Sequence, residues 1–313
     1  MINRALNQKP FVKWVGGKSQ LVKQYEELLP IDFNDWKDVT YIEPFVGGGA
    51  MLFYMLSVHQ NITNVVINDI NPKLITCYEI IRDFPNQLIE ALAEIERQYK
   101  AILTEEGKKE YYLQKRMMFN DKQDRLTTAA LFIFLNRTCF NGLYRENKKG
   151  QFNVPYGRYV SPTICDPDTI RLDSKLLQRV QIMQGDYQET LKRATGKTLF
   201  YFDPPYRPIS STSSFNDYTS QPFNDNEQIR LKKFCDIVHR NGYAFMLSNS
   251  DGAAKDPNDN FFDVLYKDYQ IKRVLARRSV NANASKRGKL SEILVHNYLH
   301  TKMELGFFPV IEE

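Results

Sequence analysis

The chain has 313 residues, of which 42% are hydrophobic and 25% charged. This composition argues against general disorder and suits one large core, or one core with a sizeable inserted domain. Lys and Arg exceed Asp and Glu by 42 to 37, a net charge of +5, so a polyanionic partner has to be recognised by local basic clusters.

Membrane, secretory and disulfide-rich classes are not expected. No apolar run approaches the roughly 18 residues of a membrane helix, and the N-terminal segment lacks the apolar region of a signal peptide. The four cysteines are scattered, at positions 77, 139, 165 and 235, without a CxxC pair. We expect a soluble, cytoplasmic protein with reduced thiols and no structural zinc site.

Residues 39–83 have the pattern of a βαβα unit, with a glycine turn between the first strand and its helix. The expected strands are 39–42 and 65–67, and the expected helix is 50–58. The alternation returns after about residue 180, with strands over 180–183, 198–202, 243–247 and 292–297 and helices over 187–194 and 225–239. This order predicts an α/β fold with a doubly wound, mostly parallel sheet.

The middle of the chain has a different pattern. Helices are predicted over 86–103, 105–119 and 125–138, followed by a loop-rich basic tract over 136–161. We interpret residues 84–178 as an inserted, mainly helical domain, and residues 1–83 and 179–313 as one discontinuous domain built on the sheet.

The sequence EPFVGGG (43–49) ends a strand and opens a helix, and Asp69 ends the next strand. Glycines permit a tight turn, and an acidic residue about 20 positions later is placed to accept ribose hydroxyls, which is typical of nucleoside binding. Glu43 would repel a pyrophosphate and suits a cationic ligand such as S-adenosylmethionine. An ordinary glycine-rich turn is an equally good interpretation of this motif alone.

The sequence DPPY (203–206) follows an apolar strand, at the end where open α/β sheets bind ligands. Asp203 and the Pro204 carbonyl could accept the two N–H groups of a nucleobase amine, Pro205 would hold them rigid, and the Tyr206 ring could stack on the base. A proline-rich strand terminator is the alternative for an isolated DPPY.

A second glycine turn occurs in FVKWVGGK (11–18), ahead of the amphipathic stretch 21–29. Lys18 could meet a ligand carboxylate and Trp14 could cover its aliphatic arm. The P-loop spacing fails because Gly16 and Gly17 are adjacent. Without the other motifs, a capped helix with a buried Trp would be the better interpretation.

Two basic tracts suggest a nucleic acid. The tract 136–161 interleaves basic, aromatic and amide side chains, and residues 271–290 contain seven basic residues and no acid. Either tract alone could be a solvated face.

Taken together, FVKWVGGK, EPFVGGG with Asp69, and DPPY, with an insert between the last two, resemble the Dam-type DNA adenine-N6 methyltransferases. The resemblance runs from about Pro10 to Tyr298 and includes FNGLYR (140–145), QFNVPYGRY (151–159) and residues 281–291.

The resemblance implies a fold of the S-adenosylmethionine-dependent methyltransferase type, with 84–178 as target-recognition domain. It implies these cofactor-binding residues: Trp14, Lys18, Glu43, Pro44, Phe45, Gly47, Gly49, Asp69, Asp186 and Asp203. It implies catalysis by Asp203, Pro204, Pro205 and Tyr206. The implied DNA-binding residues are Lys13, Asn141, Leu143, Tyr144, Arg145, Asn153, Pro155, Arg158, Tyr159, Arg277, Lys286 and Arg287.

We therefore expect a methyltransferase that takes S-adenosylmethionine as cofactor, needs no metal, and flips an adenine of double-stranded DNA, in GATC, out of the helix. We expect a monomer, located in the cytoplasm on the nucleoid. Pairing in the cell with a restriction endonuclease and marking of DNA for repair and regulation use the same chemistry, so the sequence leaves both roles open. Cytosine N4 and a protein glutamine amide are the alternative methyl acceptors, and a DNA-binding module without catalysis is the distant alternative.

Overall fold

A seven-stranded sheet forms the centre of the structure, a computed structural model that describes residues 9–14, 21–207, 223–277 and 289–300. The strand order is β3-β2-β1-β4-β5-β7-β6. The strands are β1 (Val39–Glu43), β2 (Ile62–Asp69), β3 (Val180–Gln184), β4 (Thr198–Phe202), β5 (Ala244–Ser250), β6 (Gln270–Arg277) and β7 (Lys289–His296). Strands β1 to β5 pair in parallel, and β7 is antiparallel to both β5 and β6. The predicted doubly wound, mostly parallel sheet is confirmed.

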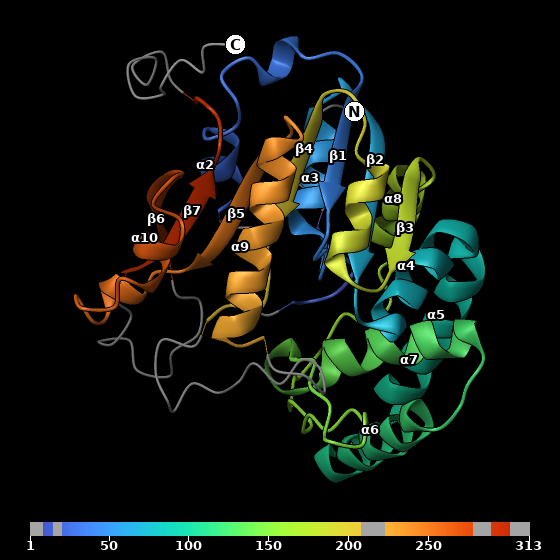
Figure 1. Cartoon of the computed structure of the whole chain (residues 1–313). Helices are drawn as coiled ribbons and strands as arrows, with labels where there is room; N and C mark the ends of the chain where they lie inside the picture. The colour runs from blue at the N-terminus through green and yellow to red at the C-terminus, as the bar shows by residue number, and fades with distance from the viewer. Residues whose placement is uncertain (1–8, 15–20, 208–222, 278–288, 301–313) are drawn as a thin grey trace, which may run out of the picture.

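Both faces of the sheet are covered, because alternate residues of each strand point to opposite faces. Tyr41 and Tyr201 belong to one apolar cluster, and Phe200 and Phe202 belong to the other. The first cluster includes side chains of α2 (Val22–Glu26), α3 (Ala50–Val58), α4 (Pro72–Asp83) and α8 (Pro167–Leu177). The second includes side chains of η4 (Tyr187–Arg193), α9 (Asp225–Arg240) and α10 (Phe261–Leu265). Figure 1 shows α9 lying across the face of the sheet toward the viewer.

Three consecutive helices, α5 (Pro85–Ala101), α6 (Glu105–Asn120) and α7 (Arg125–Thr138), follow one another in the insert, and α8, which the sequence did not predict, lies near its end. Helix α7 contacts α4, α5 and α6, and all its residues from 129 to 136 are buried. Its apolar side chains join the same cluster as those of α3 and α4. The insert is therefore packed directly on the α/β part, at the end toward which the parallel strands run (Figure 1). The insert boundaries at 84 and 178 stay a prediction.

Short 3-10 helices complete the described elements: η2 (Phe33–Asp35), η3 (Phe140–Gly142) and η5 (Gly252–Ala254). The main difference from expectation is β6. The basic tract 271–290 was not predicted to contain a strand, yet residues 270–277 form one at the edge of the sheet and pair with β7 along their whole length. Basic side chains such as Lys272 and Arg273 are compatible with an edge strand, which native proteins commonly protect with charge.

Candidate active site

A cavity of about 1040 Å³ opens at the carboxyl ends of β1, β2 and β4. Strand β1 lies between β2 and β4, where the strand order reverses, which is the place where open α/β sheets bind ligands. The cavity brings together every predicted cofactor-binding and catalytic residue that the structure describes. These are Trp14, Glu43, Pro44, Phe45, Gly47, Gly49, Asp69, Asp186, Asp203, Pro204, Pro205 and Tyr206. Lys18 lies outside the described residues.

The glycine turn after β1 needs glycine for two reasons. Gly47 and Gly49 have φ values of +48° and +74°, in the left-handed region that favours glycine. A Cβ on Gly47 would lie 2.7 Å from Nε1 of Trp14, so the indole ring lies against the turn. The hydroxyl of Tyr78, on α4, donates to the Gly47 carbonyl over 2.8 Å. The turn is therefore held between α4 and the N-terminal segment.

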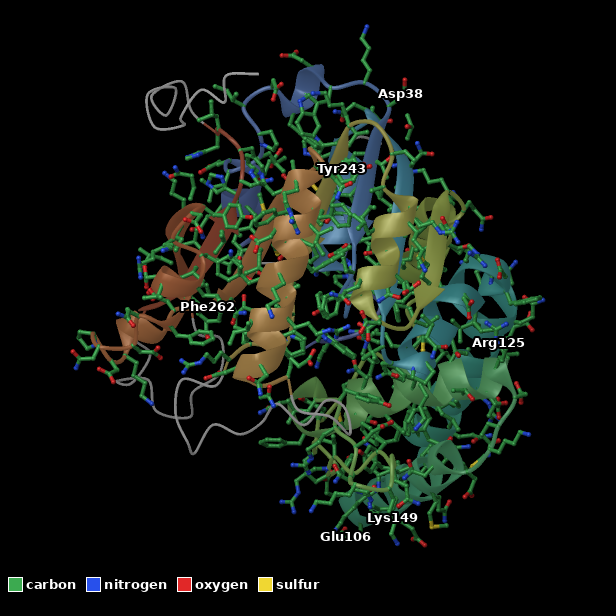
Figure 2. The ribbon with its side chains drawn as sticks, viewed as in Figure 1. Asp38, Glu106, Arg125, Lys149, Tyr243 and Phe262 are labelled. Carbon is green, nitrogen blue, oxygen red and sulfur yellow. The ribbon has the colours of Figure 1, made fainter. Side chains whose placement is uncertain are left out.

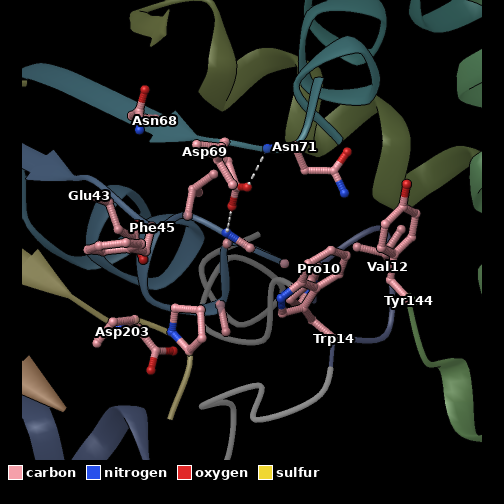
Figure 3. Close-up of a pocket in the computed structure, with 18 of the residues that line it drawn as sticks. Pro10, Val12, Trp14, Glu43, Phe45, Asn68, Asp69, Asn71, Tyr144 and Asp203 are labelled. Carbon is pink, nitrogen blue, oxygen red and sulfur yellow. Dashed lines mark hydrogen bonds between the residues drawn. The ribbon is translucent and has the colours of Figure 1, made fainter. Parts of the chain in front are cut away.

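Asp69 fixes the same turn from β2. Its Oδ2 accepts the Gly47 N–H at 3.1 Å and its Oδ1 accepts the Asn71 N–H at 2.9 Å (Figure 3). Each carboxylate oxygen keeps capacity for a further hydrogen bond. Burial raises the pKa of Asp69, while backbone N–H donors, among them those of Asn71 and Gly47, act in the opposite direction.

Glu43 makes the cavity acidic. It is 2% exposed, and burial followed by the negative charge of Asp203 raises its pKa well above the ordinary value. Within the described residues, neither its Oε2 nor the buried Oδ1 of Asn68 has a hydrogen-bond partner. Both residues line the cavity. Buried acceptors without donors suit a ligand that carries positive charge and N–H or O–H groups.

The Asp203 carboxylate is oriented by β5. Its Oδ1 accepts the hydroxyl of Ser248 at 2.9 Å, and that serine is fully buried. Figure 3 shows Asp203 and Glu43 on the same side of the cavity, opposite Trp14 and Tyr144. The hydrogen bond from Ser248 gives the carboxylate a defined direction, and a carboxylate has more acceptor sites than one such bond uses.

The backbone of residues 203–207 is held by buried amides that the sequence analysis missed. Gln228, which is 0% exposed on α9, donates to the Pro205 carbonyl over 3.1 Å and accepts the side-chain N–H of Asn249 at 3.1 Å. Asn249 in turn accepts the Arg207 N–H at 3.2 Å. Among the described residues no donor reaches the Pro204 carbonyl, which therefore stays available to a ligand. The detectable signal was the polar triplet Ser248-Asn249-Ser250 at the end of an apolar strand.

Tyr206 is fixed through its hydroxyl. It donates to Oε2 of Glu292, on β7, over 2.6 Å, and the hydroxyl of Tyr25 donates to the same oxygen over 3.2 Å. The phenol of the DPPY sequence is thus connected to β7 and, through the shared carboxylate, to α2. The sequence analysis did not single out Tyr25 or Glu292, because neither belongs to a motif.

Asp186 lies at the end of β3 and caps η4 by accepting the Gln188 N–H at 2.9 Å. Its Oδ2 also lies 2.6 Å from a guanidinium nitrogen of Arg230. The Arg230 guanidinium lies 4.9 Å from the centre of the Tyr187 ring. The sequence analysis missed Arg230, because residues 225–239 were predicted only as a helix, without a site residue.

Tyr144, predicted to bind DNA, is instead part of the cavity wall. It is 4% exposed, and its ring stacks on Trp14 and Phe132 at centroid distances of 6.0 and 5.1 Å. Its hydroxyl donates to Glu146 over 2.5 Å. Since the ring is buried, we remove Tyr144 from the set of residues expected to touch DNA.

The two predicted base-reading segments lie side by side as an irregular hairpin. Asn153 N–H donates to the Arg145 carbonyl over 3.1 Å, and Phe140 N–H donates to the Pro155 carbonyl over 2.8 Å. Tyr156, whose contacts the sequence left undefined, is in the core, with its hydroxyl 2.8 Å from that of Tyr99.

The Arg145 side chain is held within this hairpin by one hydrogen bond. Its Nε donates to Oδ1 of Asn153 over 2.7 Å. No acceptor among the described residues contacts its two terminal nitrogens, which are therefore available to a base edge or a phosphate. Asn141 and Arg158 are exposed and have positive φ values of 56° and 55°, an uncommon conformation outside glycine.

The other predicted DNA-binding residues divide into three groups. Pro155 is exposed and Leu143 is half-buried in the hairpin. Lys13 lines the cavity, and its Nζ lies 4.4 Å from the centre of the Tyr159 ring. Arg277 is the last residue of β6, and Lys286 and Arg287 lie outside the described residues.

In the part of the chain that the structure describes, no three His, Cys, Asp or Glu side chains form a group that could hold a metal ion. None of the described helices combines the length and the apolar character that crossing a membrane requires.

Residues 14–280 match the family model of the D12 class N6 adenine-specific DNA methyltransferases. The chain is 45% identical over 294 residues to the type II methyltransferase M.MjaIII of Methanocaldococcus jannaschii, a match that covers 93% of this chain and 99% of that protein. It is 40% identical to the type II methyltransferase M1.LlaDCHI of Lactococcus lactis subsp. cremoris, covering 94% and 96%. It is 30% identical to the DNA adenine methylase of Escherichia coli K12, covering 91% and 94%.

Proposed function

The chain belongs to the D12 class of N6 adenine-specific DNA methyltransferases and is an enzyme of that kind, and we propose that it methylates adenine in GATC with S-adenosylmethionine, by flipping the base into the cavity described above. The observation that carries the proposal is the shared cavity. One wall is built from the glycine turn and Asp69, and another from residues 203–206. A nucleoside cofactor and a target amine could therefore meet there.

The cofactor is assigned to the side of the cavity formed by β1 and β2. Asp69 has the remaining acceptor capacity for ribose hydroxyls, and Asp186 is assigned to the adenine amine. Buried Glu43 compensates positive charge, which fits a sulfonium and an ammonium group and does not fit a pyrophosphate. When bound, S-adenosylmethionine supplies a methyl group on a positively charged sulfur atom.

The target base is assigned to residues 203–206. An adenine amine is a poor nucleophile because its lone pair is delocalised into the ring. Asp203 and the Pro204 carbonyl accept its two N–H groups and favour a pyramidal nitrogen, while Tyr206 supports the ring face. These hydrogen bonds strengthen as the nitrogen gains positive charge during methyl transfer, so they stabilise the transition state more than the ground state.

The position of Asp203 is the reason for proposing that the target base is flipped out of the duplex. Its carboxylate faces an internal cavity at the end of the sheet, and a base stacked inside a duplex cannot reach it. The base has to leave the helix to meet the Pro204 carbonyl.

Sequence reading is assigned to the hairpin of the insert. The two terminal nitrogens of Arg145 match the spacing of guanine O6 and N7, and Asn153 orients the guanidinium. The turn of the hairpin carries Lys148 and Lys149, both exposed, which suit phosphate contacts. Figure 2 shows Lys149 at the end of the insert far from the sheet.

The rate of methyl transfer to a GATC duplex, compared with the rates for altered duplexes, tests the proposal. Labelled S-adenosylmethionine is offered with a GATC duplex and with every single-base variant of the site, and the modified nucleoside is identified after digestion. We expect N6-methyladenine, formed at least a hundredfold faster in GATC than in any variant. Equal rates across the panel would overturn the GATC assignment. The monomer and the cytoplasmic location remain predictions, and pairing with a restriction endonuclease remains one of the two roles left open.

A further inference from the structure

The antiparallel strand β7 places the Glu292 carboxylate at the end of the sheet where the parallel strands finish and the cavity lies. Because β7 runs opposite to β5, the beginning of β7 lies beside the carboxyl end of β5, and Glu292 pairs with Ser250, the last residue of β5. If β7 were parallel to β5, its last residues, and not its first, would lie beside the end of β5. Glu292 therefore lies beside residues 203–207, although it is 86 positions from Tyr206.

Residues 203–207 are fixed at several points. Ser248 holds the Asp203 carboxylate, Gln228 holds the Pro205 carbonyl, and Ser250 donates to the Arg207 carbonyl over 2.8 Å. None of these bonds restrains the Tyr206 ring. The 2.6 Å bond from the Tyr206 hydroxyl to Glu292 acts on the phenol itself.

Tyr25 joins the same carboxylate oxygen from α2. It is fully buried, its hydroxyl donates to Oε2 of Glu292 over 3.2 Å, and its ring contacts that of Tyr201 at a centroid distance of 6.1 Å. Burial raises the pKa of both Tyr25 and Tyr206 well above the ordinary value, so both phenols stay protonated and donate at neutral pH. We call these residues the Tyr25–Glu292–Tyr206 triad.

We propose that Glu292 is a positioning residue for methyl transfer, which holds the Tyr206 ring in the orientation that stacks on the flipped adenine. The inference deepens the proposed function and rests on it, because it gives Tyr206 the role of base support. Loss of the hydrogen bond removes one contact that fixes the side-chain torsions of the phenol. A ring displaced by that loss would support the base poorly, even with Asp203 in place.

The test is a double-mutant cycle between Glu292→Ala and Tyr206→Phe. Turnover is measured at saturating cofactor on a duplex that the wild-type enzyme methylates. We expect each single variant to lose about tenfold in kcat, as for a lost hydrogen bond to a charged group. We expect the double variant to lose no more than either single one, because both changes remove the same bond.

Three companion variants separate positioning from a purely structural effect. Glu292→Gln keeps an acceptor oxygen and should stay within threefold of wild type, while Tyr25→Phe should lose less than Glu292→Ala. Glu90→Gln, an exposed carboxylate on α5, is the matched control and should be unchanged. The cofactor Kd, measured by calorimetry, should stay within twofold in all of them. If Glu292→Ala does not fold, Glu292→Met, similar in length, replaces it in the cycle.

The flipped base supplies an independent readout. With 2-aminopurine in place of the target adenine, Glu292→Ala and Tyr206→Phe should shift the fluorescence of the bound duplex by the same amount. A wild-type kcat in Glu292→Ala, or losses that multiply to about a hundredfold in the double variant, would overturn the inference. A wrong GATC assignment would show only in the wild-type panel, and a fully active Tyr206→Phe would overturn the role of Glu292 alone, because phenylalanine keeps the ring that is assigned to the base.

Discussion

Glu43 and Asp203 come from the neighbouring strands β1 and β4, and both line one cavity. The charge of Asp203 contributes to the raised pKa of Glu43, after burial. Two carboxylates in a poorly solvated space repel each other, and a cation relieves that repulsion. The acidity that destabilises the ligand-free protein is therefore the feature that favours a sulfonium cofactor.

Glu43→Gln should stabilise the protein without cofactor and weaken cofactor binding. The pKa of Glu43 is raised by folding, so the folded state binds this proton more tightly than the unfolded state. Its carboxyl group therefore costs stability above its ordinary pKa, and the cost grows as pH rises toward the raised value. Thermal unfolding should show a larger gain for the variant at pH 8 than at pH 4.5. A variant that is less stable at pH 8 than wild type would contradict this.

Asp69→Ala should weaken S-adenosylmethionine binding by roughly 1–3 kcal/mol, as for a lost hydrogen bond to a charged group. Part of this loss comes from the Gly47 N–H, which loses its acceptor. Calorimetry measures the effect, and duplex affinity without cofactor should not change. Asp268→Ala, an exposed carboxylate, is the control. Undiminished cofactor binding in Asp69→Ala would refute the assignment of β2 to the ribose.

At the scale of elements, the site depends on strands and helices that carry no motif. The end of β5 and the start of β7 hold residues 203–207, and α9 contributes Gln228 and Arg230. Arg145 belongs to the hairpin that follows α7 in the insert. These contacts suggest separate tests for the rigidity of the loop and for base reading.

Gln228→Leu should destabilise the protein and slow the reaction. It leaves the Pro205 carbonyl and the Asn249 side-chain N–H buried without partners, at roughly 1–3 kcal/mol for each group. Urea unfolding and kcat at saturating cofactor measure the two effects. Gln87→Leu, at an exposed position of α5, should change neither. If Gln228→Leu kept full stability and turnover, the buried amides would have no part in holding the loop.

Arg145→Ala should change which base sequence is methylated, whereas Lys149→Ala should change the affinity for any duplex. Arg145→Ala should lose roughly 1–3 kcal/mol of discrimination at one guanine. Lys149→Ala should weaken GATC and scrambled duplexes alike and lower the slope of log affinity against log salt by about one unit. Methylation rates on single-base variants and binding at several salt concentrations distinguish them. An equal loss on every duplex in Arg145→Ala would make Arg145 a phosphate contact.

At the scale of the whole molecule, patterns local in sequence were predictable and long-range contacts were not. Helix α7 has the predicted bounds, because its apolar run and Asp124 cap are adjacent in the chain. Glu292 could not be predicted, since its role depends on the antiparallel direction of β7. Strand β6 was not predicted, because its basic side chains favoured the interpretation of this tract as a nucleic-acid-binding surface. Tyr144 was assigned to DNA because it lies within a reading segment, and only the packing of Trp14 and Phe132 on its ring shows that it is buried.

The most direct test of the central claim is the turnover of Asp203→Ala at saturating cofactor and DNA. If the cavity at the end of β4 is the place of methyl transfer, kcat should fall at least a hundredfold, as when a preorganised transition-state hydrogen bond is removed. Duplex affinity should stay near the wild-type value, because base reading is assigned to the insert. Turnover within a few-fold of wild type would contradict the account, since the amine would then be activated elsewhere.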